Sequence, residues 1–277
     1  MRLVTYDVGA GPRAGVLEGD VVRDVWGFDA PVPPDRRCVG ELVRAGLVNE
    51  VEASGPELAL GDVTLLPPVR NPGKIVCVGL NYRSHAEEAG LEAPDTPTFF
   101  AKFSNALAGA GAEVALPAYS EKVDFEAEVA FVVGCRCSNV AEEDGLSCIA
   151  GYMLFNDLSA RDYQFKTPQW MPGKVFDGSA PCGPALVTPD EAGDPIELSL
   201  TLNGERMQHA TTDDLVHSVP ALVAYLSTLM TLEPGDIVAT GTPAGVGSVR
   251  SPRVWLKPGD EVVVSSPTLG ELRTVLR

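Results

Sequence analysis

Short apolar runs separated by turn residues recur along most of this chain, whereas stretches with helical spacing are few. The best helical candidate is 220–230, which follows a potential N-cap at Ser218. Strands that do not alternate with helices argue against a doubly wound parallel sheet and favour an antiparallel or mixed one. We therefore expect a β-rich α+β fold. The expected strands are residues 2–6, 16–17, 21–22, 74–79, 98–103, 125–133, 151–156, 198–203, 236–240 and 261–265.

The length of 277 residues allows one large domain with a small partner. Prolines cluster without periodicity at 67–72, which is typical of a boundary between domains. The segment before them contains a hairpin pattern and one helix-like stretch, 39–50. We predict a small N-terminal α+β domain, residues 1–67, followed by a larger domain, residues 68–277.

The chain carries 38 acidic and 21 basic side chains, which gives a formal net charge of −17 with His neutral. A surface this acidic repels nucleic-acid phosphates and anionic lipids. The N-terminus has no apolar segment before a small-residue cleavage site, and the longest apolar-rich stretch, 219–232, is too short to span a bilayer. We expect a cytoplasmic protein with neither a nucleic-acid nor a membrane partner.

Six cysteines without an export signal indicate reduced thiols rather than a disulfide framework. Cys135 and Cys137 are separated by one residue, a spacing that suggests a metal. The sequence offers no second cysteine pair or nearby histidine to complete a tetrahedral zinc site. We therefore interpret the thiols as small, buried apolar side chains.

The segment 124–133 combines acidic residues with strand-like alternation. On a strand, Asp124, Glu126 and Glu128 lie on one face, and that face then becomes apolar. Acidic side chains that converge at the edge of a core repel one another unless a cation lies between them. Oxygen donors prefer hard ions, so Mg²⁺ is expected first, with Mn²⁺ or Ca²⁺ as alternatives. The competing interpretation is a half-exposed strand whose acidic residues face water.

A second acidic cluster follows the expected strand 151–156. Asp157 comes at the end of that strand and is able to supply a third ligand beside Glu126 and Glu128. Three carboxylates leave coordination positions for water or substrate, as a catalytic metal requires. The sequence thus predicts an open site for a divalent metal.

His85 and Glu88 are three residues apart in a segment with the features of a short helix. Ser84 and Glu87 match a capping box, and Gly90 is placed to end the helix. His85 and Glu88 would share a helix face and form a pair able to take a proton from water. A histidine near a helix start also has a purely structural interpretation.

Basic and polar residues near the acidic clusters are candidates for binding an anionic substrate. Arg161, Gln164 and Lys174 lie in a stretch with neither helical nor strand periodicity, which is also compatible with an ordinary solvated loop. The segment 241–247 is rich in glycine but lacks the ending of a P-loop. We interpret it as a tight turn that brings backbone N–H groups and the Thr242 hydroxyl near a ligand.

Together these segments resemble the fumarylacetoacetate hydrolase family, in particular its acylpyruvate-hydrolase-like branch. The resemblance keeps the family's order over residues 74–277, and the leading block is similar to the small, variable domain that often precedes the catalytic one. The matching segments are residues 78–82 with His85 and Glu88, residues 124–128, residues 155–157 with 159–162, residues 173–174 and residues 240–247.

The resemblance implies a fold and a metal. The fold would be the family's mixed β-roll, assembled as a homodimer. Glu126, Glu128 and Asp157 match the residues that bind Mg²⁺ or Mn²⁺ in the family. The sequence departs from the family at Phe103, where a proline is usual, and at Val175, where a serine is common, so we expect these two residues to reshape the pocket.

The resemblance also implies roles for the remaining candidates. His85 and Glu88 match a water-activating pair on a lid that orders over the substrate, and Lys174 matches a lysine that stabilises negative charge. The residues that match positions contacting substrate oxygens are Arg161, Gln164 and Thr242.

The leading hypothesis is hydrolysis of a C–C bond in a small anionic 2-oxo acid of the acylpyruvate type. Water activated by His85 and Glu88 would attack the distal carbonyl, and cleavage would leave an enolate stabilised by the metal and Lys174. The same site would serve decarboxylation of oxaloacetate, or keto–enol or double-bond isomerisation of a 2-hydroxydienoate. An alternative of another class is a non-catalytic subunit in which the acidic cluster binds a structural cation.

Overall fold

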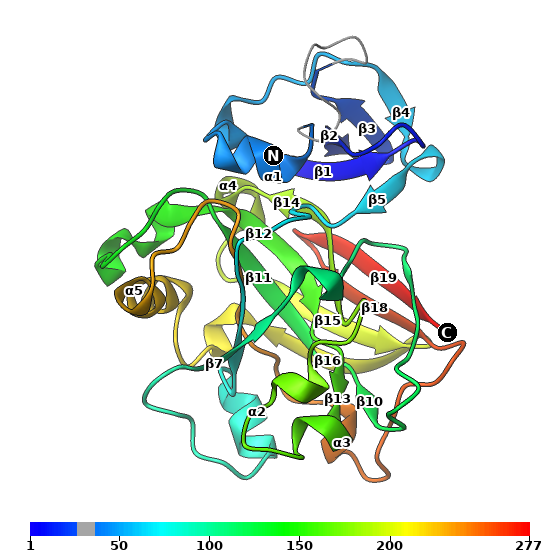
Figure 1. Cartoon of the computed structure of the whole chain (residues 1–277), viewed down its shortest axis with the longest axis vertical. Helices are drawn as coiled ribbons and strands as arrows, with labels where there is room; N and C mark the ends of the chain where they lie inside the picture. The colour runs from blue at the N-terminus through cyan, green and yellow to red at the C-terminus, as the bar shows by residue number, and fades with distance from the viewer. Residues whose placement is uncertain (27–36) are drawn as a thin grey trace.

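The computed structural model describes residues 1–26 and 37–277. Within these residues the strands form a 12-stranded sheet, a 5-stranded sheet and a 2-stranded ribbon, and helices are few. The predicted β-rich α+β fold is confirmed. Figure 1 shows a smaller unit, built from the first part of the chain, above a larger unit that holds the rest.

The smaller unit is an antiparallel meander with a short helix. Helix α1 (Val39–Arg44) and the 3₁₀ turn η2 (Val48–Glu50) replace the single helix expected over this stretch. The helix ends before Gly46, which has a φ of 70°, a left-handed conformation that glycine adopts readily. The strands of this unit are β1 (Arg2–Asp7), β2 (Arg13–Glu18), β3 (Val21–Asp24), β4 (Glu57–Ala59) and β5 (Thr64–Leu66).

The two units share one hydrogen-bonded sheet. Strand β1 pairs antiparallel with β14 (Ala180–Val187), and Arg2 lies opposite Val187. Because β1 has a neighbour on each side, its backbone is not an open edge that another chain could extend. A domain boundary after residue 67 stays a prediction.

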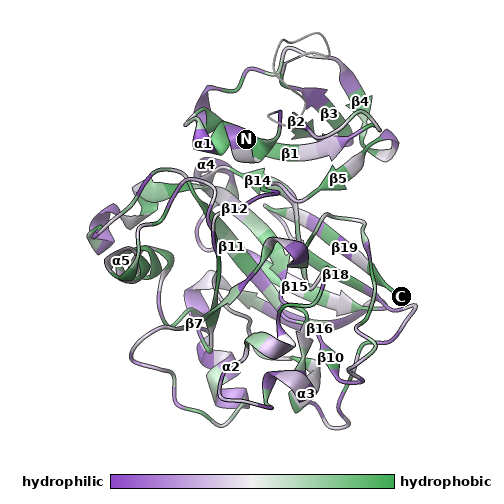
Figure 2. Cartoon of the chain, viewed as in Figure 1, coloured by the Kyte–Doolittle hydropathy of each residue, from purple (hydrophilic) through white to green (hydrophobic). Residues whose placement is uncertain are grey.

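Strands β11 and β12 form the centre of the larger unit and are buried along their whole length. Figure 2 shows both as hydrophobic, which is typical of strands covered on two faces. Glu128 is the one ionisable residue in β11, and because it is buried it needs a hydrogen-bonding or positively charged group beside it. The central strands are β11 (Ala127–Val133), β12 (Ile149–Asn156), β17 (Ile237–Ala239), β6 (Ile75–Gly79) and β7 (Thr98–Lys102).

A 5-stranded sheet packs against these strands. Its inward residues, among them Leu198, Leu200 and Val264, share one hydrophobic core with Val129 and Phe131 of β11. The two packed sheets, which contain parallel and antiparallel pairs, form a mixed β-roll. The strands of the second sheet are, in spatial order, β16 (Glu205–Thr211), β15 (Glu197–Leu202), β18 (Glu261–Ser266), β19 (Gly270–Leu276) and β9 (Glu113–Val114).

Helix α5 (Val219–Leu229) forms where the sequence predicts a helix, and the Ser218 hydroxyl accepts a hydrogen bond from the Ala221 N–H as its cap. The remaining elements are short. They are η3 (Leu60–Asp62), η4 (Ser104–Ala106), β8 (Leu107–Ala108), β10 (Val123–Asp124), η5 (Glu142–Cys148), β13 (Ser159–Ala160), α3 (Arg161–Gln164), η6 (Met171–Gly173), α4 (Pro189–Ala192), η7 (Thr212–Asp214) and η8 (Gly247–Val249).

Helix α2 (Arg83–Glu88) forms as expected, but the capping box predicted for it is wrong. Tyr82 is the N-cap and makes no side-chain cap hydrogen bond. The Ser84 hydroxyl donates to the Asp214 carboxylate, which lies far along the chain. A charged acceptor supplied by the tertiary structure thus replaces the local one.

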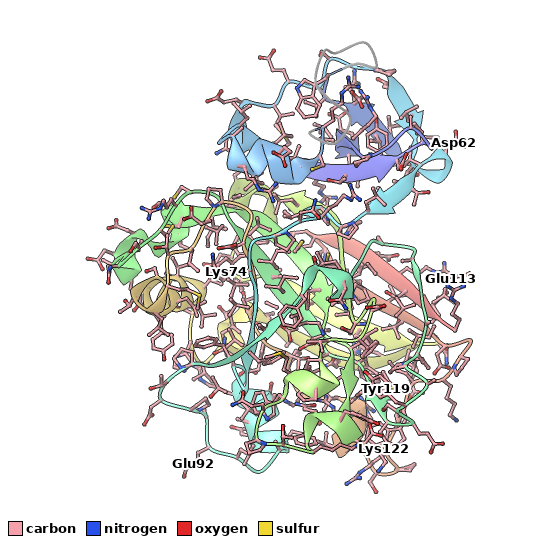
Figure 3. All side chains as sticks on the ribbon, viewed as in Figure 1. Asp62, Lys74, Glu92, Glu113, Tyr119 and Lys122 are labelled. Atoms are coloured by element: carbon pink, nitrogen blue, oxygen red, sulfur yellow. The ribbon has the colours of Figure 1, made fainter. Side chains whose placement is uncertain are left out.

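The surface carries the charge that the composition implies. Figure 3 shows Asp62, Glu92, Glu113 and Lys122 at the outline of the molecule, and all four are exposed. All six cysteines have free thiols, and the interpretation as buried side chains is wrong for Cys135, which is exposed. No helix in the described parts of the chain has the length and apolar character needed to cross a membrane.

A buried ion pair stabilises the smaller unit. The Arg13 guanidinium donates hydrogen bonds of 2.5 and 2.7 Å to Asp24, and the Tyr6 hydroxyl donates a further one. Asp24 is fully buried and Arg13 is 5% exposed. Burial alone would raise the pKa of Asp24, but the hydrogen bonds from Arg13 and Tyr6 outweigh it and lower the pKa.

Asp24→Asn is expected to lower the free energy of unfolding by about 3–5 kcal/mol, because the buried Arg13 loses its counter-charge. Urea denaturation at pH 7 measures the change, with exposed Asp20→Asn as the control. Since the pKa of Asp24 is lowered in the folded state, its stabilisation is complete above the usual aspartate pKa and is lost as the pH falls. A variant as stable as the unmodified protein at pH 7 would contradict this account.

Candidate active site

Three carboxylates meet where β11 begins and β12 ends. Glu126 precedes β11, Glu128 lies in it and Asp157 follows β12, and one oxygen of each lies within 4.8 Å of the others. The antiparallel register, with Ala127 opposite Asn156, brings these strand ends together. The Asp157 N–H donates to the Glu126 carbonyl at 2.9 Å, which fixes the two backbones next to each other. The structure thus groups the three predicted metal ligands.

Asp124 does not join this cluster, so the expected convergence of three acidic residues from one strand is wrong. The strand is interrupted, because β11 begins only at Ala127. The Asp124 carboxylate instead accepts hydrogen bonds from the Arg161 guanidinium and from the N–H groups of Gly247 and Ser248. Asp124 therefore anchors neighbouring segments.

Cations surround part of the carboxylate cluster. The Lys174 ammonium lies 2.6 Å from Glu126 and 2.8 Å from Asp157, and Lys102 lies 2.7 Å from Asp157. Arg161 pairs with Glu126 at 2.6 Å. Burial raises the pKa of Glu126, but the charges of Arg161 and Lys174 outweigh it and hold the pKa at about 2. Glu126 is therefore ionised at every physiological pH.

Glu128 lacks such a counter-charge. Burial, followed by the charges of Asp157 and Glu126, raises its pKa well above the usual range, and a 2.8 Å hydrogen bond from the Gly241 N–H only partly opposes this. Among the described residues it forms no ion pair. A cluster of buried carboxylates with one left uncompensated, and with oxygen atoms as its only ligand atoms, fits a hard divalent cation.

His85 lies beside the cluster on α2, with its side chain 13% exposed. Its Nδ1 is 3.7 Å from the Glu88 carboxylate and has no hydrogen-bond partner among the described residues. Glu88 instead accepts the Gly245 N–H at 2.9 and 3.0 Å. Burial lowers the pKa of His85, so the imidazole is neutral at pH 7 and has a lone pair available for a proton.

A cavity of about 160 Å³ joins these groups. It is smaller than the pockets of about 300–1,000 Å³ that bind drug-sized ligands. One wall is apolar and includes Val78, Phe100 and Trp170. The rings of Phe100 and Trp170 pack edge to face, with their centroids 5.9 Å apart. Glu88 is not part of the lining. The predicted site residues that do line it are His85, Glu126, Glu128, Asp157, Arg161, Gln164, Lys174 and Thr242.

The sequence profile described as Fumarylacetoacetate (FAA) hydrolase C-terminal matches residues 74–277. The chain belongs to the fumarylacetoacetate hydrolase family. The predicted resemblance is confirmed. A second profile, described as Rv2993c-like, N-terminal, matches residues 1–68. This family member therefore carries an N-terminal domain of that type before its fumarylacetoacetate hydrolase domain.

Relatives in the family carry names for different reactions. The chain is 41% identical to the mitochondrial oxaloacetate tautomerase Fahd2a of Rattus norvegicus, over 98% of this chain and 90% of that protein. It is 33% identical to 2-hydroxyhepta-2,4-diene-1,7-dioate isomerase from Mycobacterium marinum, over 100% and 98% of the chains with a TM-score of 0.81. It is also 33% identical to maleylpyruvate hydrolase from Sphingobium sp. SYK-6, over 100% of both chains with a TM-score of 0.82.

The glycine-rich segment of this family member contacts three acidic side chains. The N–H groups of Gly241, Gly245 and Gly247 donate to the carboxylates of Glu128, Glu88 and Asp124. That these N–H groups lie near a ligand stays a prediction. The segment therefore holds three carboxylates in position. The Thr242 hydroxyl, which does line the cavity, accepts a hydrogen bond from Gln208.

Two polar residues that help to form the site were not identified from the sequence. Lys102 ends β7 and is 2% exposed, with its ammonium on Asp157. Gln208 accepts the Ala127 N–H at 2.9 Å and donates to the Pro243 carbonyl at 2.8 Å, so it ties the glycine-rich segment to β11. A lysine that ends an apolar strand is the available signal for Lys102, because a buried ammonium needs a carboxylate. Gln208 carries no comparable signal.

Gly79→Ala is expected to disturb the cavity wall. An added Cβ at Gly79 would lie 2.2 Å from the Trp170 ring, so the ring must move. We expect a loss of about 1–3 kcal/mol in the free energy of unfolding together with a raised KM. Thermal unfolding and steady-state kinetics measure the two effects, and Gly61→Ala, where nothing lies within 4 Å, is the matched control. Equal behaviour of the two variants would show that Trp170 does not pack as described.

Proposed function

We propose that this family member is a divalent-metal-dependent tautomerase that interconverts the enol and keto forms of a small 2-oxo diacid such as oxaloacetate. The observation that carries the proposal is a neutral imidazole, with an unpartnered nitrogen, that lines the same small cavity as the carboxylate cluster. The name of the 41% identical relative from Rattus norvegicus supports the same substrate.

The reaction moves one proton between carbon 3 and the oxygen on carbon 2. Mg²⁺ or Mn²⁺, held by Glu126, Glu128 and Asp157, would supply Lewis acidity toward the 2-oxo acid. His85 is neutral and lines the cavity, so in this proposal it would take the proton from one atom and return it to the other. Neutral imidazole is regenerated in each cycle, so no further reactant is needed.

The other lining residues have narrower roles in this proposal. Arg161 and Lys174 keep Glu126 ionised and in place through their ion pairs. Gln164 and Thr242 offer an amide and a hydroxyl at the cavity wall, which suit the carboxylates of a diacid. The apolar wall excludes water, which strengthens these interactions.

Hydrolysis of an acylpyruvate is the second candidate, and the position of Glu88 favours it. Glu88 lies 3.7 Å from His85, so a modest side-chain movement would complete a pair able to activate water. The name of the maleylpyruvate hydrolase from Sphingobium sp. SYK-6 supports this reaction. Tautomerisation is preferred because it requires only His85, whereas Glu88 is hydrogen-bonded to Gly245.

The two reactions are separated by one pair of assays. The enol of oxaloacetate is added to the protein in buffer with Mg²⁺, and the decay of its ultraviolet absorbance is compared with the uncatalysed decay. We expect an acceleration of at least about 100-fold, as for a positioned general base, that is lost with a chelator and restored by Mg²⁺. Cleavage of acylpyruvates without this acceleration would establish the hydrolase instead. Failure of both reactions would favour a non-catalytic metal-binding subunit.

The homodimer and the cytoplasmic location both stay predictions. Sedimentation of the purified protein at micromolar concentration tests whether it forms a homodimer.

A further inference from the structure

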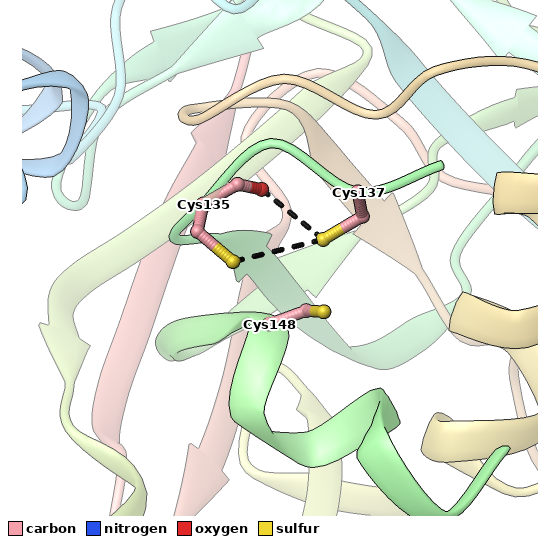
Figure 4. Close-up of side chains that lie close together, drawn as sticks. All are labelled: Cys135, Cys137 and Cys148. Atoms are coloured by element: carbon pink, nitrogen blue, oxygen red, sulfur yellow. Dashed lines mark hydrogen bonds between the residues drawn. The ribbon is translucent and has the colours of Figure 1, made fainter. Parts of the chain in front are cut away.

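Three cysteines form a cluster outside the cavity. Figure 4 shows Cys135, Cys137 and Cys148 close together, and their sulfur atoms all lie within 4.8 Å of one another. The Sγ atoms of Cys135 and Cys137 are 3.8 Å apart. The third thiol, Cys148, lies eleven residues further along the chain than Cys137, so the sequence pattern alone does not group it with the other two.

Backbone hydrogen bonds fix Cys137 and Cys148, and the Cys137 thiol donates to the Cys135 carbonyl at 3.1 Å. Cys137 exchanges two hydrogen bonds of 2.9 Å with Leu232, and the Cys148 carbonyl accepts the Gly134 N–H at 2.7 Å. Cys148 is the last residue of η5 and leads directly into β12. A cluster fixed in this way is preorganised, so a ligand would not have to order it.

The ligand atoms of this cluster differ from those of the carboxylate cluster. It contains no carboxylate or imidazole, so its ligand atoms are all sulfur. Sulfur ligands select soft or borderline ions, and Mg²⁺ is excluded.

We propose that Cys135, Cys137 and Cys148 form a second metal site, which takes a thiophilic d¹⁰ ion such as Zn²⁺. Two sulfur atoms bound to one tetrahedral ion at about 2.3 Å lie about 3.8 Å apart, which matches the distance between Cys135 and Cys137. Each thiol releases its proton to solvent as its thiolate binds. Cys135 is exposed and gives the ion a route in and a fourth, solvent-facing position.

This site is separate from the carboxylate cluster. Glu128 lies near the start of β11 and Cys135 lies beyond its end. The strand between Glu128 and Val133 alone spans about 17 Å. The two ends of one strand therefore select different ions, a hard one through oxygen and a thiophilic one through sulfur. The proposal does not depend on the reaction catalysed in the cavity.

The test uses the full reduced chain with Mg²⁺ in excess, so that the carboxylates are occupied. Co²⁺ is the probe, because thiolate ligands give it an ultraviolet charge-transfer band that carboxylates do not. We expect a band that saturates at one equivalent of Co²⁺ and disappears when Zn²⁺ is added. Cys135→Ser and Cys148→Ser should each weaken Co²⁺ binding at least about 100-fold, whereas Cys182→Ser, a buried cysteine outside the cluster, should not.

A second measurement guards against misfolding of the variants. In the unmodified chain, Zn²⁺ should slow alkylation of Cys135 by at least tenfold, on the order expected for a metal-bound thiolate. Oxaloacetate turnover with Mg²⁺ should be unchanged in Cys135→Ser. Absence of the band, a band that survives both cluster variants, or a Cys135 alkylation rate unaffected by Zn²⁺ would each overturn the proposal.

Discussion

Glu128→Gln is expected to lower metal-dependent turnover by on the order of 1000-fold, since a lost ligand removes several kcal/mol of transition-state stabilisation. The same change should stabilise the protein when no metal is bound. In that state the Glu128 carboxylate is buried beside Asp157 and Glu126 and forms no ion pair among the described residues. An amide of the same shape removes this repulsion and keeps the size of the side chain.

The pH dependence of stability gives the sign of this effect. The pKa of Glu128 is raised in the folded state, so its protonated form is stable at low pH and stability is lost as the pH rises above the usual glutamate pKa. The stability advantage of Glu128→Gln over the unmodified protein should therefore grow from pH 4 to pH 7 in a chelator. Mg²⁺ should reduce this advantage, because the metal stabilises the unmodified protein more than the variant.

Urea denaturation with and without Mg²⁺ measures the stability difference, and exposed Glu121→Gln is the control. If Glu128→Gln lost activity and was also less stable than the unmodified protein in the chelator, the described carboxylate cluster would be contradicted. Unchanged activity would remove Glu128 from the metal site.

His85→Ala is the second change with a large expected effect. We expect kcat to fall about 10²–10⁴-fold, the range for loss of a general base, whereas exposed His209→Ala should have no effect. Because burial lowers the pKa of His85, kcat/KM should decline only below the usual histidine pKa as the pH falls and the base becomes protonated. Full activity in His85→Ala would contradict its role as the base.

Glu88→Gln separates the two proposed reactions. If the protein is a tautomerase, turnover by Glu88→Gln should stay within about tenfold of the unmodified protein, since Glu88 is not needed to move the proton. If it is a hydrolase, turnover should fall by a further factor of ten or more, because Glu88 no longer orients His85. Exposed Glu87→Gln, on the same helix, is the matched control for this comparison.

The features that the sequence predicted well are those set by periodicity. Alternation grouped Glu126 with Glu128, although it wrongly added Asp124, and the end of the next strand placed Asp157 beside them. Both follow from the two-residue period of a strand and the pairing of neighbouring strands. The family resemblance then supplied roles that the residue pattern alone left open.

The features that the sequence missed depend on tertiary contacts. Strand β14 contains Pro181, Gly183 and Pro184, which indicate a loop, yet it lies between β1 and β12 and is fully buried. The Ser84 hydroxyl does not form the predicted capping box and instead donates to Asp214, which lies 130 residues away in the sequence. Such partners are set by the packed fold, and no local pattern contains them.

The central claim is that a divalent cation held by Glu126, Glu128 and Asp157 binds a 2-oxo acid in the cavity. Calorimetric titration with oxalate, a planar mimic of the enolate, tests it most directly. The account predicts that oxalate binds at one site per chain when Mg²⁺ is present and does not bind in a chelator. Equal oxalate binding with and without Mg²⁺, or no binding in either, would contradict it.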